Sequence, residues 1–370
     1  KMASLLSIGR LTLRRFSSQR SFSSKLDQQI LEDSIKALGG TPLKSTAFSM
    51  PPPKGITESE LFNCLKLSEV ELKGMPAVTL REVGNAYLRG NQIGQDEAQA
   101  VYFWQLAKMN GDKDATHSLA LALYKGDGIQ INKREAVEEL ENLVKDDHVL
   151  AKYSLAKIII DESSQQEESD NTLVSLIGNE TRALELYKSA AKGGVLRALN
   201  NVANMYANGI GTSQDDRIAL KWYEAAAEMG DPVAMFTLAS WYNTGRLGEE
   251  EWEKGFKWNE LAAMAGYPRA QYNLGFHLFV GKGVEKDIPK AIEWFQMAAE
   301  RGIGEACVNL GEIYRVGMGT KADFSRSKYW HQKAVGYGSQ VAQDILEDEK
   351  SFTYISSDEA EAESPSSSSK

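Results

Sequence analysis

Cysteine is scarce in this sequence, with only Cys64 and Cys307 among 370 residues. Two cysteines so far apart do not make a disulfide framework, so we expect both thiols to be reduced. Histidine is almost as rare, and no two histidines, or histidine and cysteine, have the spacing of a metal site. The four histidines are His117, His148, His277 and His331. The sequence therefore predicts no metal site and no cofactor.

Basic runs are missing between residues 79 and 346, and the formal net charge is −9 at pH 7. A nucleic-acid binder needs clustered Lys and Arg to neutralise phosphates, so we expect no nucleic-acid partner. We also find no nucleophile–base constellation and expect no transmembrane segment. These absences argue against an enzyme and favour a binding or structural role.

Two amphipathic segments lie between Ala270 and Gly302. Residues 270–278 and 291–299 each place small and large apolar side chains at helical spacing, along one narrow stripe. The stretch therefore predicts a helical hairpin. One hairpin of this length cannot bury both of its faces, so further copies must stack beside it.

Copies of this hairpin recur along the chain with a period of 36 residues. Each copy begins with a small leading residue: Thr79, Ala115, Ala151, Ala198, Ala234, Ala270 and Ala306. Only the interval from Ala151 to Ala198 is longer, by eleven residues. The pattern predicts seven hairpins, with one insertion in the third.

Fixed positions after the leading residue have recognisable roles. A large aliphatic residue follows four places on, with Gly or Ala directly after it, so that large and small side chains of neighbouring helices interlock. Glycine ends the first helix of every hairpin except the third, in a left-handed cap. Six second helices are preceded by a hydrogen-bond acceptor typical of a helix start: Asp96, Asn132, Asn179, Asp215, Asp287 and Asp323.

The second helices add two further columns. Glycine closes each of them except the second, where Asp147 takes its place. The tryptophans of the second helices share one repeat position, which we interpret as a core position. His331 shares a different repeat position with Tyr223 and Phe295, so we predict that it is a histidine packed in the core. Pairs such as Gly281 and Gly283 follow helices and precede no Gly-Lys-Ser/Thr, so we interpret them as turns and not as phosphate-binding loops. The tryptophans of this column are Trp222, Trp258, Trp294 and Trp330.

This pattern resembles the Sel1-like repeat family, which is related to the tetratricopeptide repeats. The resemblance covers Thr79 to about Leu346. It implies an all-α fold, a right-handed superhelical solenoid of about seven 36-residue helix–turn–helix repeats, which binds other proteins and has no chemistry of its own. Several family members pair cysteines between the helices of each repeat, and this chain does not.

Residues 1–25 differ from the rest of the chain because they carry basic residues and no acid. Serines and apolar residues separate these bases, a composition typical of a mitochondrial transit peptide, with cleavage expected after Phe22. A secretory signal is the alternative, but Arg10 interrupts its apolar core. We therefore expect mitochondrial import, to the matrix or to the surface of the inner membrane.

The segments outside the repeats have distinct compositions. Residues 26–56 contain an amphipathic stretch and three consecutive prolines and are predicted to be a linker, followed by an N-terminal capping helix within 57–76. The repeat solenoid is predicted to span 77–350. Its insertion at 161–172 carries acids and no base, so we expect it to loop out. Residues 351–370 are rich in Ser and acids and are predicted to be a disordered tail.

In the related tetratricopeptide repeats the first helices line a concave groove that holds the ligand. The resemblance places partner-binding residues two, three, six and nine positions after the leading residue. They are Asn200, Asn201, Asn204, Phe236, Ser240, Tyr272, Asn273, Phe276 and Phe279. We expect the asparagines to hold the backbone of a peptide and the aromatic rings to contact its side chains. The alternative is that Phe236, Tyr272 and Phe279 pack against adjacent helices.

The sequence thus predicts a mitochondrial adaptor that binds a protein or peptide. By family resemblance, its role is that of an assembly or maturation factor for a mitochondrial complex. A stress or cell-death signalling adaptor and a structural subunit of a larger mitochondrial assembly are the alternatives.

Overall fold

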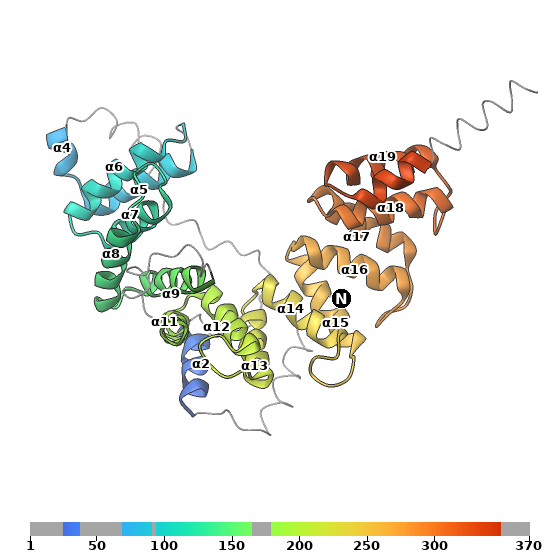
Figure 1. Cartoon of the computed structure of the whole chain (residues 1–370), viewed down its shortest axis with the longest axis horizontal. Helices are drawn as coiled ribbons and strands as arrows, with labels where there is room; N and C mark the ends of the chain where they lie inside the picture. Colours follow the sequence, from blue (N-terminus) through green and yellow to red (C-terminus); the bar gives the residue numbers. More distant parts are fainter. Residues whose placement is uncertain (1–24, 38–68, 91–93, 165–178, 349–370) are drawn as a thin grey trace, which may run out of the picture. The chain divides into compact units, whose positions relative to one another are not determined.

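A computed structural model describes residues 25–37, 69–90, 94–164 and 179–348 of the chain (Figure 1). All regular elements in these ranges are helices. The helices form two compact units, unit 1 up to Met229 and unit 2 from Gly230, and each is described by itself. The predicted transit peptide, most of the predicted capping helix, Cys64 and the tail lie outside the described residues.

Unit 1 contains four helical hairpins in which each helix packs against the next. They pair α5 (Ala77–Arg89) with α6 (Glu97–Met109), α7 (Lys113–Lys125) with α8 (Lys133–Lys145), α9 (Val149–Ser164) with α11 (Glu180–Lys192), and α12 (Leu196–Asn208) with α13 (Asp216–Glu228). A short helix, α4 (Glu69–Lys73), precedes them. The Asn110 side chain ties this helix to the end of α6, because its amide donates to the carbonyls of Lys73 and Met75.

Unit 2 contains three hairpins of the same kind. They pair α14 (Pro232–Asn243) with α15 (Trp252–Met264), α16 (Pro268–Val280) with α17 (Ile288–Glu300), and α18 (Gly304–Val316) with α19 (Phe324–Gly336). Residues 340–348 form one further helical stretch, and Ala342 within it is buried. Because Ala342 lies 36 residues after Ala306, this stretch continues the repeat by half a hairpin.

The six side chains predicted to cap the starts of the second helices are found in that role. All six acceptors lie directly before a second helix and accept a hydrogen bond from one of its first backbone amides. In the remaining hairpin, the fifth, Glu251 precedes α15 without a side-chain bond. Asp147, which replaces the closing glycine after α8, has a φ of 62° and is the one non-glycine residue with positive φ in the described chain. The same left-handed turn is therefore kept there without glycine.

Small residues of the first helices receive large residues of the second helices. A Cβ atom built on Gly84 would lie 2.7 Å from the Trp104 ring, and one on Gly275 would lie 2.8 Å from the Phe295 ring. A Cβ on Gly311 would come within 2.3 Å of His331, which is fully buried as predicted. These contacts confirm the interlocking columns and explain why no larger residue fits there.

The tryptophan column is less buried than predicted. Trp222 and Trp330 are buried, whereas Trp258 and Trp294 are only half-buried. The residues that follow them are buried in every case: Tyr223, Asn259, Phe295 and His331. The deepest column of the second helix is therefore the one directly after tryptophan, because that position faces the small residue of the first helix.

The first part of the predicted linker is not a linker. Residues Lys25–Ala37 form helix α2, which packs against α11 and α13 (Figure 1). Its contact face buries Leu31 and Ser34. The amphipathic pattern noted in this stretch belongs to a docked helix, since its apolar side chains leave water only by packing on another element.

The start of the insertion also differs from its prediction. Residues Asp161–Ser164 do not loop out but extend α9, whose end lacks the glycine that stops other first helices. Glu162 is buried, and its carboxylate accepts from the Tyr124 hydroxyl at 2.5 Å and from Lys133 Nζ at 2.8 Å. An acidic side chain is buried here because two donors compensate its loss of water. Residues 165–172 lie outside the described chain.

Candidate interaction surface

The asparagines predicted to hold a peptide lie on α12 in unit 1. Asn204 is exposed, but its side-chain oxygen accepts from the Tyr223 hydroxyl at 2.5 Å. Asn201 is half-buried and hydrogen-bonds to Tyr187. Asn200 is half-buried, and its Oδ1 has no hydrogen-bond partner in the described part of the chain. Two of the three amides are thus engaged within the unit.

The aromatic residues predicted to hold side chains lie in unit 2, and most are packed. The Phe236 ring lies 5.2 Å from that of Tyr267 between centroids. Tyr272 and Phe279 both contact the ring of Phe295, at 5.7 and 6.4 Å. All three predicted residues are half-buried. These contacts are those expected of the alternative, packing against adjacent helices, and ligand binding by the three rings stays a prediction.

Phe276 differs from the three other aromatic residues predicted to bind a partner, because 39% of its surface is exposed. Val280 lies one helical turn further along α16 and is 42% exposed, and Val316, its repeat equivalent on α18, is 57% exposed. We call Phe276, Val280 and Val316 the apolar strip of unit 2. Ser240 and Asn273, the remaining predicted residues, are half-buried. The two valines were missed from the sequence, although each is an apolar residue directly before the glycine that ends a first helix.

In unit 1 the first helices are joined by charged and imidazole side chains. Arg81 on α5 places Nη1 3.1 Å from an oxygen of Asp112 and 2.7 Å from one of Asp114. Asp114 accepts from His148 Nε2 at 3.0 Å, because His148 Nδ1 itself accepts the backbone N–H of Ala151. This polar ladder links α5, α7 and the start of α9.

His117 completes the polar ladder. Its Nε2 lies 2.8 Å from the Ser154 hydroxyl, and its ring lies 5.6 Å from that of His148. Burial, together with the neighbouring His148, lowers the pKa of His117 to about 4, although Asp114 acts in the opposite direction. The imidazole is therefore neutral at neutral pH and serves as a packed hydrogen-bonding group.

Residues 31 positions apart meet between successive first helices. This spacing joins Arg81 to Asp112, His117 to His148 and, in unit 2, Phe236 to Tyr267. One partner lies two places after a leading residue, and the other lies three places before the next leading residue. Because leading residues are 36 positions apart, the two partners are 31 positions apart. This spacing could have revealed the polar ladder from the sequence.

A second buried histidine lies in unit 2. His277 on α16 donates from Nδ1 to the Lys282 carbonyl at 2.8 Å, and its Nε2 lies 3.0 Å from Asn243 Nδ2 and 3.2 Å from Asn259 Nδ2. Burial lowers the pKa of His277. The three side chains come from α14, α15 and α16, so this cluster ties neighbouring hairpins together.

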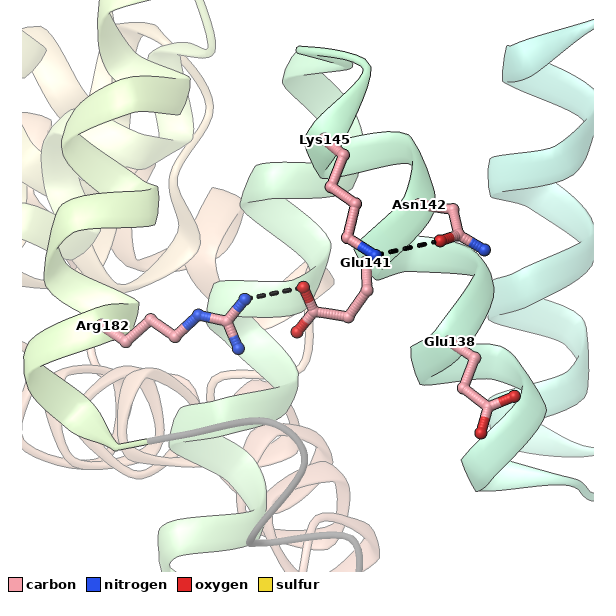
Figure 2. A pocket seen from close by; sticks show the side chains of 5 residues that line it. All are labelled: Glu138, Glu141, Asn142, Lys145 and Arg182. Carbon is pink, nitrogen blue, oxygen red and sulfur yellow. Dashed lines mark hydrogen bonds and ion pairs between the residues drawn. The ribbon is translucent and has the colours of Figure 1, made fainter.

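An open depression lies between α8 and α11 in unit 1, with a volume of about 480 Å³ (Figure 2). Arg182 donates to Glu141 at 2.7 Å across it, while Glu138 points away from this ion pair. Acids and bases are mixed along its wall, so it favours no ligand charge. Its lining residues are Glu138, Glu141, Asn142, Lys145 and Arg182.

The described residues hold no group of three or more His, Cys, Asp or Glu side chains placed to bind a metal ion. Cys307 is fully buried, and burial raises the pKa of its thiol. In the same part of the chain, no helix is long and apolar enough to cross a bilayer. The chemistry available on the first helices is hydrogen bonding and apolar contact.

Comparison with protein families gives repeated matches along the chain. The family described as Sel1 repeat matches residues 78–112, 113–138, 175–195, 196–231, 232–267, 268–303 and 304–335. Together these seven matches cover more than half of the sequence. No curated protein sequence matches the chain.

Two bacterial proteins of known structure are similar to this chain. A protective antigen of uropathogenic Escherichia coli strains, which displays an SLR fold, is 25% identical with a TM-score of 0.56. That match covers 73% of this chain but only 56% of the antigen, so the chain spans little more than half of that protein. A Sel1 repeat protein from Oxalobacter formigenes is 22% identical with a TM-score of 0.63, over 88% of this chain and 91% of that one.

Proposed function

This chain belongs to the Sel1 repeat family, and we propose from that premise that it is a non-enzymatic scaffold of mitochondria that holds a partner polypeptide on its first helices. Sel1 repeat proteins are generally protein-interaction scaffolds. Among the described residues, the exposed large apolar side chains on the first helices of unit 2 are those of the apolar strip and Val233. This strip is the observation that carries the proposal, because exposed apolar surface on a packed repeat favours a protein partner.

The partner polypeptide contacts Phe276, Val280 and Val316 through apolar side chains. Asn273, half-buried on α16 in the same unit, adds a polar contact. Assembly or maturation of a mitochondrial complex is the role that we favour, because such a factor must hold unassembled chains on an open surface. The protein itself lies in the matrix or peripherally on the inner membrane.

Location is tested separately from binding. A fusion of residues 1–30 to a neutral reporter should be imported and shortened, since its bases are drawn inward by the membrane potential. Replacing Arg10, Arg14 and Arg15 with Glu should abolish import. Centrifugation of sonicated mitochondria then separates a peripheral protein, which sediments with the membranes and is released by carbonate, from a matrix protein, which stays in the supernatant. Delivery of the fusion to the secretory pathway would refute the mitochondrial proposal.

Binding is tested with a strip variant, in which Phe276, Val280 and Val316 are replaced by Ala. Partners captured from mitochondrial lysate by the unmodified chain should be lost from this variant, and the loss should be reproduced with the purified partner. Met264→Ala is the matched control, because Met264 is 53% exposed in unit 2 but lies on a second helix. A folded strip variant that keeps every partner would refute the proposed surface.

A further inference from the structure

Helix α2 packs on the second-helix side of unit 1, mainly against α11 and also against α13 (Figure 1). The hairpin helices are each held by a neighbour that follows directly in the chain. By contrast, α2 is separated in sequence from α11 by more than 140 residues. This contact is therefore a docking contact between a helix and a preformed surface.

The contact face of α2 has a defined chemistry. Leu31 and Ser34 are 8% and 0% exposed, with Ile30 and Ile35 half-buried beside them. Their spacing places these four side chains on one face of a helix. The Ser34 hydroxyl donates to the Ile30 carbonyl at 2.7 Å, within α2 itself. Ser34 thus serves as a small residue at the centre of the contact, where the two helices approach closely.

One ion pair orients the docked helix. Asp33 Oδ2 lies 3.4 Å from Lys192 Nζ at the end of α11. Lys145 occupies the same repeat position at the end of α8, which α2 does not pack against, and hydrogen-bonds there to Asn142. Lys192 on α11 therefore pairs with α2, whereas the equivalent Lys145 on α8 bonds within its own helix.

Two of the side chains described at residues 29–36 of α2 are buried, and a helix of 13 residues is barely stable alone in water. Attachment through the chain raises the local concentration of α2 and keeps it docked. A helix in another protein can compete if it presents the same groups.

We propose that the surface formed by α11 and α13 is a helix-binding site, which α2 occupies in the free chain and which accepts an amphipathic helix of a partner in place of α2. The partner helix carries aliphatic residues at positions i, i+1 and i+5, a small residue at i+4 and an acid at i+3, as α2 does with Ile30, Leu31, Ile35, Ser34 and Asp33. The site is distinct from the apolar strip, and the proposal does not depend on the strip.

The test uses the full chain and a fluorescent synthetic peptide of residues 25–37. Leu31→Asp in the full chain should release α2 and leave its surface open. This variant should bind the peptide on the order of tenfold more tightly than the unmodified chain, in which α2 competes. Circular dichroism of the variant checks that the hairpins remain folded. Equal binding by both chains would overturn the proposal.

Residue-level controls use the same Leu31→Asp chain. Adding Lys192→Glu should weaken peptide binding by about tenfold, and a peptide with Asp33→Lys should restore it. The matched change Lys145→Glu should leave binding unchanged, and an equal loss from both changes would count against the site.

Peptide variants test the close approach. A peptide with Ser34→Ala should bind like the unmodified peptide, whereas Ser34→Leu should lose about tenfold in affinity because the larger side chain blocks the approach.

A dimer of the unmodified chain that disappears in Leu31→Asp would show that α2 docks on a second copy, and would overturn its occupancy in the same chain. The strip variant changes only first helices of unit 2, whereas the peptide tests concern α2, α11 and α13. The proposed function and the α2 site can therefore fail independently of each other.

Discussion

In unit 1 the first helices α5, α7 and α9 are joined by charged and imidazole side chains, whereas in unit 2 the equivalent position carries the aromatic pair Phe236 and Tyr267. Both sets connect residues 31 positions apart. The repeat backbone therefore fixes which positions meet, and the side chains there decide how the contact responds to pH. This difference also concerns binding, since residues used between repeats are unavailable to a partner.

The largest expected effect is common to both units. Leu155 in unit 1 and Leu274 in unit 2 occupy the same repeat position, and they are 0% and 2% exposed. Replacing either with Ala should lower the free energy of unfolding by about 2 to 5 kcal/mol, because each change leaves a cavity in the hairpin core. Urea unfolding of the two variants measures the cost. A cost well under 1 kcal/mol in only one unit would contradict the shared architecture.

Acid should affect unit 1 through His117. The unfolded chain binds a proton at this residue near pH 6.5, and the folded chain only near its lowered pKa of about 4. Stability therefore falls as the pH drops through this window, by about 2 kcal/mol between pH 7 and pH 5. His117→Gln should remove this part of the pH dependence in urea unfolding at the two pH values. The pKa of His277 is also lowered, so some dependence should remain.

If His117→Gln keeps the full pH dependence, the polar ladder does not bury a neutral imidazole. His148 is unchanged in this variant, so its hydrogen bond to Asp114 is kept. The change in pH dependence can then be assigned to His117.

A smaller effect is expected at Asn204, which is exposed yet bonded to a buried partner. Tyr223 is 1% exposed, and Asn204→Ala removes the hydrogen bond that its hydroxyl donates to Asn204. The expected cost is about 0.5 to 1.5 kcal/mol, the usual net contribution of one hydrogen bond. The double variant Asn204→Ala with Tyr223→Phe should cost less than the sum of the two single changes, because both remove the same hydrogen bond. Thermal and urea unfolding of the double and single variants provide the comparison.

The smallest effect is expected at Phe276 in the apolar strip. Phe276→Ala should change the free energy of unfolding by no more than about 0.5 kcal/mol, since much of its ring already faces water. Phe279→Ala, three residues further on, should cost more because Phe279 packs on Phe295. Equal costs from the two changes would show that Phe276 is a packing residue and would weaken the proposed binding surface.

Much of the fold could be predicted because helix ends are local events. Each acceptor before a second helix bonds an amide two or three residues away, so the side chain and its partner lie in the same stretch of sequence. The exposed strip could be predicted only in part. Phe276 was identified, but Phe236 and Tyr272 could not be told from binding residues, because their neighbours lie 31 and 23 residues away in the chain.

By itself the sequence determined the hairpins, their period and their caps, because these depend on spacing within one or two helical turns. Only the tertiary structure decided three other features: the docking of α2, the burial of Glu162 and the pairing of His117 with Ser154. Each joins residues at least 29 positions apart in the sequence. Burying these polar side chains costs free energy unless a group on the other helix bonds to them. A polar residue in a sequence gives no sign of that partner, which is why the start of the acidic insertion was predicted to loop out.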